Sequence, residues 1–401
     1  MSTTSTSTDG RVPSILPDDA ATALLVGRVW DPVSGGPRPV RVSGDDVYDL
    51  TDVAPTVAEL LEGDDIAHLV ADVSGTPSWR LGDLVEASLG KDTARPHLLA
   101  PVDLQVIKAC GVTFVDSMIE RVIEERSDGD PLRAQQVRET LAGALQAGIG
   151  TVEPGSPEAE RVKQVFLAEG LWSQYLEVGL GPDPEVFTKA PVLSAVGYGA
   201  GIGIPRFSTW NNPEPELVLI VDSRGRARGC TLGNDVNLRD VEGRSALLLG
   251  MAKDNNASAA LGPFIRLFDD AFTLDTVRSE RITLRVEGAE DGYVLEDENN
   301  VARLSRSFER LISAAHGDHH QYPDGFALYT GTLFAPTQDR DVLGTGFTHK
   351  TGDRVTIASR HLGALVNDVA PTHELPAWEF GIRSLVEYLR RLSPTRTSDE
   401  R

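Results

Sequence analysis

The segment NNPEPELVLIV, residues 211–221, places two glutamates one residue apart at the start of an apolar run. Residues two apart on a strand share a face, so Glu214 and Glu216 point the same way. A proline precedes each glutamate and cannot donate to a sheet ladder, which places these residues at the start or on the edge of a strand. The run LVLIV that follows predicts that this strand enters the interior.

A second strand is expected to return beside the first. DSRG at 222–225 is a turn sequence, and residues 226–240 follow it. A turn centred between Ser223 and Arg224 places Glu214 opposite Gly233, with Asp235 about two residues beyond. That diagonal offset is ~7–8 Å between backbones, which two carboxylate side chains can close around one ion.

Three carboxylates on two neighbouring strands predict a metal site. Buried carboxylates are costly without a cation, and an all-oxygen site suits Mg²⁺, Mn²⁺ or Ca²⁺ better than zinc or copper. The alternative is that Glu214, Glu216 and Asp235 are solvated surface residues, as most acidic residues are. The apolar run directly after Glu216 favours the metal site.

Composition excludes several classes of partner. The 401 residues carry a formal net charge of −22, which disfavours nucleic acid and anionic membrane surfaces. A small anionic substrate would need a local cation in that field. No signal peptide and no apolar run of ~20 residues is present, and Cys110 and Cys230 form no metal or disulfide pattern. We therefore expect a cytoplasmic protein that does not enter membranes.

Composition shifts along the chain predict its organisation. Helical spacing of apolar residues follows the first strand of the central region, and short strands with Gly- and Pro-rich turns occupy most of the rest. The helical insertion is expected to serve as a lid or an interface. The expected parts are disordered tails at 1–12 and 393–401, a small α+β domain at 13–96, and a catalytic domain at 97–392 with a helical insertion at 117–176 and an amphipathic helix at 378–392.

Beyond these patterns, an ordered set of motifs resembles the fumarylacetoacetate hydrolase superfamily. The motifs are PEPE (213–216), GNDVNLRD (233–240), Lys253, LGPF (261–264), ALYTGT (327–332) and GDRVTIASRHLGALVNDV (352–369). The resemblance implies an α+β fold whose catalytic part is a mixed β-roll that binds one divalent cation, usually Mg²⁺.

The family's functional residues carry over onto matching positions. The metal ligands become Glu214, Glu216 and Asp235, and the ion is chelated by a 2-oxo acid through its carboxylate and keto oxygens. Lys253 matches the active-site lysine. Thr332 and Arg239 match residues that contact the substrate.

One departure separates this chain from the hydrolases of the superfamily. Their N-Y-x-x-H-x-x-E pattern corresponds here to TFVDSMIE (113–120), where Ser117 replaces the histidine and only Glu120 remains. Without that histidine the pair cannot activate water in the usual way. Together with PEVFTK (184–189), the segment resembles the branch that dehydrates 2-keto-3-deoxy sugar acids, which makes Glu185 a catalytic carboxylate and Ser117 a substrate contact.

The resulting prediction is a metal-dependent hydro-lyase of oxidative pentose catabolism that converts a 2-keto-3-deoxy pentonate into 2,5-dioxopentanoate. Lys253 is the expected base, with a pKa lowered towards neutral by the ion and by burial, and Glu185 the expected acid, although the two roles can be exchanged. The chain is expected to form a homodimer or homotetramer. The alternatives are a carbon–carbon hydrolase or decarboxylase of an acylpyruvate-like acid, and an inactive metal-binding or assembly module.

Overall fold

A computed structural model gives the fold, and it describes residues 13–128, 130–138, 152–168, 170, 172–332, 336–343 and 345–392. The tails expected at 1–12 and 393–401 lie outside the described residues, as does part of the predicted helical insertion. No helix among the described residues is long and apolar enough to cross a membrane.

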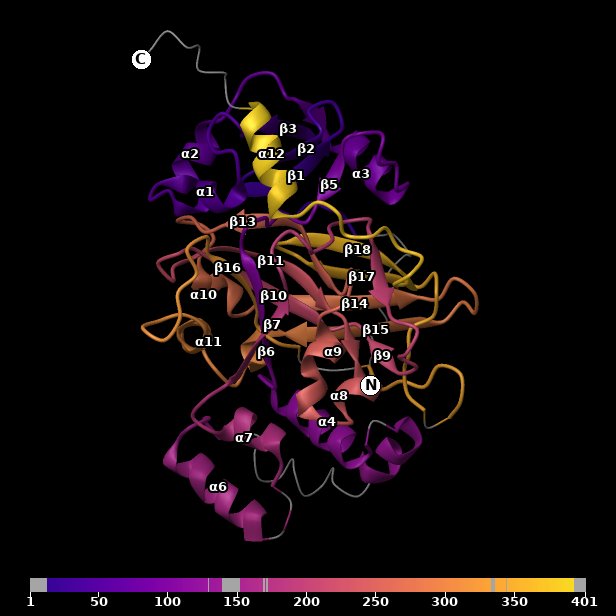
Figure 1. Cartoon of the computed structure of the whole chain (residues 1–401). Coiled ribbons are helices and arrows are strands. Elements are labelled where there is room, and N and C mark those ends of the chain that lie inside the picture. The colour runs from indigo at the N-terminus through magenta and orange to yellow at the C-terminus, as the bar shows by residue number, and fades with distance from the viewer. Residues whose placement is uncertain are drawn as a thin grey trace, which may run out of the picture.

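The strands form two large sheets and one small ribbon (Figure 1). The first sheet runs in the order β4-β3-β2-β1-β13-β11-β10-β16-β6-β7, with β5 paired to β1, and the second in the order β15-β14-β17-β18-β8. Strands of the first sheet are β1 (Leu25–Asp31), β2 (Gly36–Ser43), β3 (Asp46–Asp49), β4 (Trp79–Arg80), β5 (His97–Leu99), β6 (Val106–Gly111), β7 (Glu185–Ala190), β10 (Pro215–Val221), β11 (Ala227–Asp235), β13 (Ala259–Leu267) and β16 (Phe326–Tyr329). Strands of the second are β8 (Gly201–Ile204), β14 (Arg281–Glu287), β15 (Val294–Asn300), β17 (Arg354–Ser359) and β18 (Gly363–Pro371), and the ribbon consists of β9 (Asn211–Asn212) and β12 (Asn237–Leu238).

Short helices cover the edges and ends of these sheets. Side-chain caps fix the start of two helices. Thr56 accepts a hydrogen bond from Glu59 N at the start of α1. Ser156 precedes the proline that opens α6 and accepts from Ala159 N at 3.1 Å. The helices are α1 (Val57–Glu62), α2 (Ile66–Asp72), α3 (Leu81–Leu89), α4 (Val115–Arg126), α6 (Pro157–Ala168), α7 (Gln174–Leu180), α8 (Arg239–Glu242), α9 (Leu249–Lys253), α10 (Leu274–Val277), α11 (Phe308–Ala315) and α12 (Ile382–Leu392).

The N-terminal and C-terminal parts of the chain meet at one end of the molecule (Figure 1). There α12 lies against the N-terminal strands, and its Tyr388 is fully buried against Gly36. Because β1 pairs with β13 at Leu25 and Arg266, the N-terminal strands extend the sheet of the central region. The boundary between residues 96 and 97 remains a prediction.

Strand β10 is the centre of the fold. It pairs with β11 and β16, and all seven of its residues are buried. Leu217 and Leu219 pack in the core cluster that also holds side chains of the second sheet, such as Leu284, whereas Val218 and Ile220 pack in the cluster that reaches α1. Glu214 and Glu216 continue the face of the latter pair. The carboxylates therefore stand where a buried strand begins.

Candidate metal centre and active site

The register of β10 and β11 differs by two residues from the one expected. Glu216, not Glu214, pairs with Gly233, and Asp235 N donates to Glu214 O at 3.0 Å. The expected pairing of Glu214 with Gly233 was wrong for two reasons. The turn closes over five residues, with Gly225 at a φ of +76°, and the register shifts again at a bulge between Ile220 and Val221. Asp235 consequently lies directly opposite Glu214, closer than the predicted diagonal.

The three predicted metal ligands come together. Glu214, Glu216 and Asp235 each offer an oxygen within 4.8 Å of the others, and all three are buried. At this spacing three anions repel one another strongly. Burial, together with the charges of Asp235 and Glu214, raises the pKa of Glu216 well above its usual range. Oxygen donors at such spacing fit a hard divalent cation, so these side chains are suited to hold Mg²⁺.

Backbone geometry fixes the position of Glu216. Its Oε2 accepts from Gly331 N at 2.6 Å. Gly331 has a φ of +99°, and a Cβ at this residue would lie 1.9 Å from the hydroxyl oxygen of Thr113. Only glycine can therefore present this N–H here. The next residue, Thr332, is also buried, and its contact with the substrate stays a prediction.

Two buried lysines contact the carboxylates. Lys253 Nζ, at the end of α9, lies 2.6 Å from Glu214 Oε2 and 3.0 Å from Asp235 Oδ2. Lys189 Nζ lies 2.8 Å from Asp235 Oδ1 and donates to Val236 O at 3.0 Å. Burial would raise the pKa of Asp235, but these lysines outweigh it and hold the pKa below its usual range.

The expected lowering of the pKa of Lys253 is not found in the metal-free chain. Burial lowers it, but Asp235, Glu214 and Glu242 outweigh burial and raise the pKa of Lys253. A cation between the same carboxylates would oppose this effect, because like charges disfavour the ammonium form.

The predicted acid, Glu185, approaches the same region from β7. It pairs with Gly111, and a Cβ at that glycine would lie 1.9 Å from Glu185 Oε2. Burial, and next the charge of Glu242, raises the pKa of Glu185 to about 7. On the same face of β7, Phe187 has the ammonium of Lys253 5.8 Å from its ring centroid, and Lys189 contacts Asp235. A carboxyl group with a pKa near 7 therefore lies on β7, the strand whose Lys189 contacts the metal ligand Asp235.

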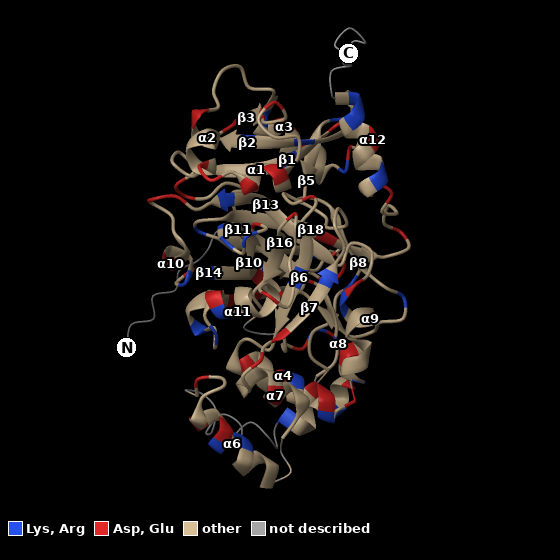
Figure 2. Cartoon of the chain, turned by 60° about the vertical axis from the view of Figure 1, so that its left-hand side comes forward, with Lys and Arg blue, Asp and Glu red and all other residues tan. Residues whose placement is uncertain are grey.

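Helix α4 supplies a network that the sequence did not predict. Its Arg121 donates to Glu214 Oε1 and lies 2.6 Å from Glu124 and 2.8 Å from Glu242. Figure 2 shows acidic and basic positions side by side around α4 and α8. Arg121 is separated from Glu214 by 93 positions, and its only sequence signal is a charged residue within the apolar stripe of an expected helix. Lys189 had a clearer signal, since it follows Glu185 by four residues on one strand face.

The two predicted substrate contacts from this region already have partners. Arg239 is fully buried, with Nε 2.6 Å from Glu124 Oε1 and the guanidinium 4.2 Å from the centroid of Trp210. Ser117 lies one turn before Arg121 on α4, and its hydroxyl donates to Phe114 O at 2.9 Å. Glu120, the remnant of the hydrolase motif, forms ion pairs with Arg138 and Arg239.

Buried charges around the centre do not balance. Five buried carboxylates face four buried cationic side chains, and Glu185 lies beside them. The carboxylates are Glu124, Glu214, Glu216, Asp235 and Glu242, and the cations are Arg121, Lys189, Arg239 and Lys253. With all of these groups ionised the excess is negative, which is the sign that a bound cation would offset.

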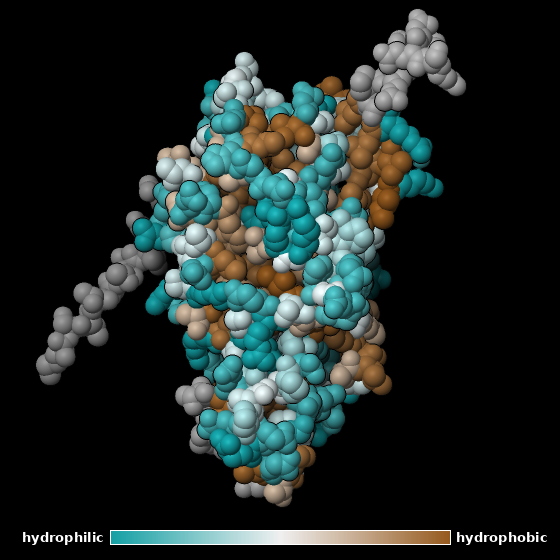
Figure 3. All heavy atoms as spheres, turned by 90° about the vertical axis from the view of Figure 1, so that its left-hand side faces the viewer, coloured by the Kyte–Doolittle hydropathy of each residue, from teal (hydrophilic) through white to brown (hydrophobic). Residues whose placement is uncertain are grey.

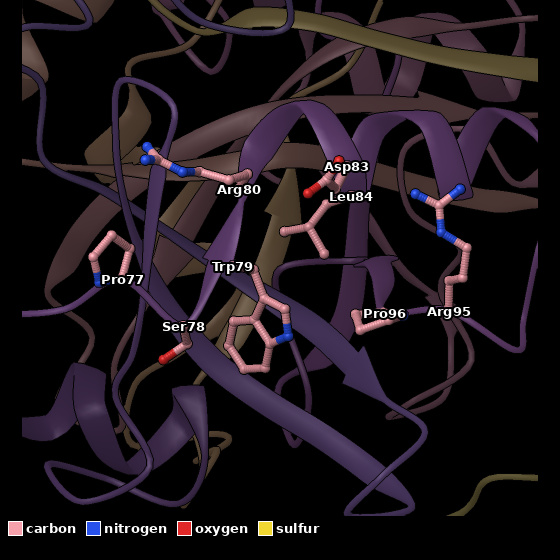
Figure 4. A pocket seen from close by; sticks show the side chains of 8 residues that line it. All are labelled: Pro77, Ser78, Trp79, Arg80, Asp83, Leu84, Arg95 and Pro96. Atoms are coloured by element: carbon pink, nitrogen blue, oxygen red, sulfur yellow. The ribbon is translucent and has the colours of Figure 1, made fainter.

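A hollow elsewhere on the molecule is lined by none of the carboxylates of this centre. Its volume is about 420 Å³, and it lies between β4 and α3, where Trp79, Arg80 and Arg95 are among its lining residues (Figure 4). Arg80 pairs with Asp46, and Arg95 lies 3.3 Å from Glu86. Both arginines are at least partly exposed and already paired with carboxylates, and none of the predicted site residues lines the hollow.

Comparison with known proteins identifies the family. A family model described as fumarylacetoacetate (FAA) hydrolase, C-terminal, matches residues 170–370, half of the chain. The chain belongs to the fumarylacetoacetate hydrolase family. The matched part contains the three carboxylates, Lys253 and Thr332, so the resemblance inferred from the motifs is confirmed.

Two curated proteins resemble this chain. A protein named probable 2-keto-3-deoxyxylonate dehydratase from Haloferax volcanii is 29% identical over 341 residues, which cover 84% of this chain and 96% of that protein. A 2-dehydro-3-deoxy-D-arabinonate dehydratase from Saccharolobus solfataricus is 33% identical over 190 residues, which cover 46% of this chain and 58% of that protein.

Two solved structures confirm the fold. The apo form of a 2-keto-3-deoxy-D-arabinonate dehydratase matches with a TM-score of 0.62 at 21% identity, and its complex with magnesium and 2,5-dioxopentanoate matches with 0.60. Each match covers 87% of this chain and 99% of the other. The predicted α+β fold of the fumarylacetoacetate hydrolase type is therefore confirmed.

Proposed function

We propose that this protein is a divalent-metal-dependent hydro-lyase that converts a 2-keto-3-deoxy pentonate into 2,5-dioxopentanoate. The observation that carries the proposal is the buried cluster of Glu214, Glu216 and Asp235 with Lys253 in contact with two of them. The relative named as a probable 2-keto-3-deoxyxylonate dehydratase supports the substrate class, because the match covers 96% of that protein.

The carboxylate cluster would hold Mg²⁺, with Mn²⁺ and Ca²⁺ as alternatives of the same chemical class. When bound, the ion supplies Lewis acidity that withdraws charge from the 2-oxo acid and so acidifies its C3 protons. Gly331 N–H orients Glu216, and Arg121 orients Glu214, so both ligands are held in place before the ion arrives.

Lys253 and Glu185 move the protons of the reaction. Lys253 takes a C3 proton, and Glu185, with a pKa of about 7, protonates the C4 hydroxyl as it leaves as water. Rearrangement of the dehydrated product, in which C5 becomes an aldehyde, gives 2,5-dioxopentanoate. In the reverse assignment Glu185 is the base and Lys253 the acid. Thr332 and Arg239 are proposed to contact the substrate, as is Ser117.

The competing function is hydrolysis or decarboxylation of an acylpyruvate-like acid, since the family name refers to a hydrolase. Ser117 at the position of the hydrolase histidine argues against hydrolysis. The test is to incubate purified protein and Mg²⁺ with 2-keto-3-deoxy-arabinonate, 2-keto-3-deoxy-xylonate and acylpyruvates, and to follow the products by NMR. We expect 2,5-dioxopentanoate, and faster cleavage of an acylpyruvate than any dehydration would overturn the proposal.

We infer that the protein acts in the cytoplasm as a homodimer or homotetramer. Apolar side chains are exposed along α12 and just before it: Trp378 is 47%, Ile382 56% and Val386 40% exposed. Figure 3 shows this apolar strip beside the C-terminal end. A second copy of the chain would bury such a strip. Light scattering that gives a mass near 43.2 kDa at all concentrations would overturn this inference.

A further inference from the structure

The register of the β10–β11 ladder continues beyond the metal ligands into the β9–β12 ribbon. Glu216 pairs with Gly233, Glu214 lies opposite Asp235, and in the same register Asn212 pairs with Asn237. Because side chains alternate between faces, these three rungs share one face. Just beyond the ribbon, the guanidinium of Arg239, the first residue of α8, lies 4.2 Å from the ring centroid of Trp210. The two asparagines therefore stand between the carboxylates and this stacked pair.

The asparagine pair is buried, and three of its four side-chain polar atoms lack a hydrogen-bond partner among the described residues. Both residues are 0% exposed. Asn212 Nδ2 donates to Pro213 O at 2.9 Å, but Asn212 Oδ1 and both side-chain polar atoms of Asn237 have no partner within the described part of the chain. The indole N–H of Trp210, just beyond the ribbon, also lacks one. Buried polar atoms are almost always satisfied, so these unpaired atoms require a partner, which a bound ligand or a water can provide.

We propose that the amides of Asn212 and Asn237 form the subsite that binds the terminal C5 hydroxyl of the substrate. The inference rests on the proposed function, which places the 2-oxo acid end of the ligand at the carboxylates. Strand residues rise about 3.4 Å each, so the amide rung lies about 7 Å farther along the face, on the scale of an extended five-carbon acid. A hydroxyl both donates and accepts, and the unpaired amide atoms offer an acceptor and a donor.

This subsite would select substrates by their hydroxyl end. A site built to hydrogen-bond a hydroxyl discriminates strongly against an analogue that lacks it, because its buried polar atoms are then left unpaired. Metal ligation recognises only the 2-oxo acid end, which many metabolites share. The asparagine pair thus distinguishes a sugar acid from a plain 2-oxo acid.

Calorimetry with two ligands tests the subsite in the presence of Mg²⁺. The ligands are 5-hydroxy-2-oxopentanoate and 2-oxopentanoate, which differ only in the terminal hydroxyl and carry no C4 hydroxyl to lose. We expect the wild-type protein to bind the hydroxylated ligand about 10-fold more tightly. Asn237→Leu and Asn212→Leu should reduce this preference to about 2-fold or less without weakening the binding of 2-oxopentanoate.

Gln105→Leu is the matched control variant. Gln105 is also buried, and its Nε2 also lacks a partner within the described residues, but it precedes β6 at the end of that strand remote from Glu185. This variant should keep the full preference. If Asn237→Leu does not fold, Asn237→Ser, which removes the amide while keeping a small polar side chain, carries the same expectation.

Two results would overturn the subsite: a wild-type protein that binds both ligands equally, or a preference that survives in both asparagine variants. The latter would mean that buried water satisfies the amides. Failure of the proposed function gives a different pattern. A protein that prefers the hydroxylated ligand but dehydrates no 2-keto-3-deoxy pentonate would overturn the function alone, and one that dehydrates the pentonate without the preference would overturn the subsite alone.

Discussion

The β10–β11 ladder and helix α4 both bury carboxylates, yet with opposite electrostatic outcomes. On the ladder, burial and neighbouring anions raise the pKa of Glu216 well above its usual range. On α4, burial would raise the pKa of Glu124, but Arg121 and Arg239 outweigh it and lower the pKa. Glu124 is neutralised by Arg121 of the same helix and by Arg239 of α8, whereas Glu216 forms no ion pair among the described residues and is suited to bind a cation from outside.

Arg121 connects the two regions, because one guanidinium contacts Glu214 of the ladder and Glu124 of the helix. The β10–β11 ladder and helix α4 would then contribute differently to catalysis. The ladder provides the metal ligands, the end of α9 provides Lys253, and helix α4 fixes the geometry of Glu214. Variants should separate these contributions, because a change on the ladder removes chemistry and a change on the helix alters positioning.

The largest effect is expected at Lys253. Lys253→Ala should lower turnover by ~10²–10⁴, because it removes the group that moves the C3 proton. Affinity for Mg²⁺ should not fall, since the three carboxylates remain and lose a competing cation. Steady-state kinetics and calorimetry check both statements. A loss of Mg²⁺ binding as large as the loss of turnover would assign Lys253 to the structure of the metal centre.

A smaller effect is expected on the helix side. Arg121→Lys keeps the charge but cannot reach three carboxylates at once, so Mg²⁺ affinity should fall by ~10–100-fold. Arg126→Lys, an exposed change on the same helix, is the control and should leave Mg²⁺ affinity unchanged. If the two variants bind Mg²⁺ equally well, α4 does not position the ladder.

The pH profile reports on Glu185. If it acts as the acid, it must be protonated, so its own titration should leave kcat/KM unchanged below a pKa of about 7 and lower kcat/KM tenfold per pH unit above it. Glu185→Gln should abolish that descending limb. A rise of kcat/KM through the same pH range would instead identify Glu185 as the base and support the exchanged roles.

Ser117→His tests the sequence departure and should have the smallest effect. The hydroxyl of Ser117 bonds to Phe114 O in a buried position, and the neighbouring charges of α4 are already paired. We expect no measurable acylpyruvate hydrolysis from this variant in product analysis by NMR. Gain of hydrolysis would show that a single side chain decides between the two chemistries.

Local patterns were enough to find the ladder but not its surroundings. The alternation in PEPELVLIV gave the shared face of Glu214 and Glu216, and the motif order gave the fold. The register was two residues off, because loop length and a bulge cannot be read from the letters DSRGRARG. Arg121 and the partnership of Lys189 with Asp235 depend on tertiary packing between distant segments, which periodicity within one element does not encode.

The most direct test of this account is a calorimetric titration of EDTA-treated protein with Mg²⁺, performed on the wild type and on Glu216→Gln. Burial and neighbouring anions raise the pKa of Glu216 well above its usual range, so a bound cation would favour its ionised form. We predict one Mg²⁺ per chain for the wild type and at least ~100-fold weaker binding for the variant. Absence of Mg²⁺ binding by the wild type, or equal affinity in both proteins, would contradict the metal centre.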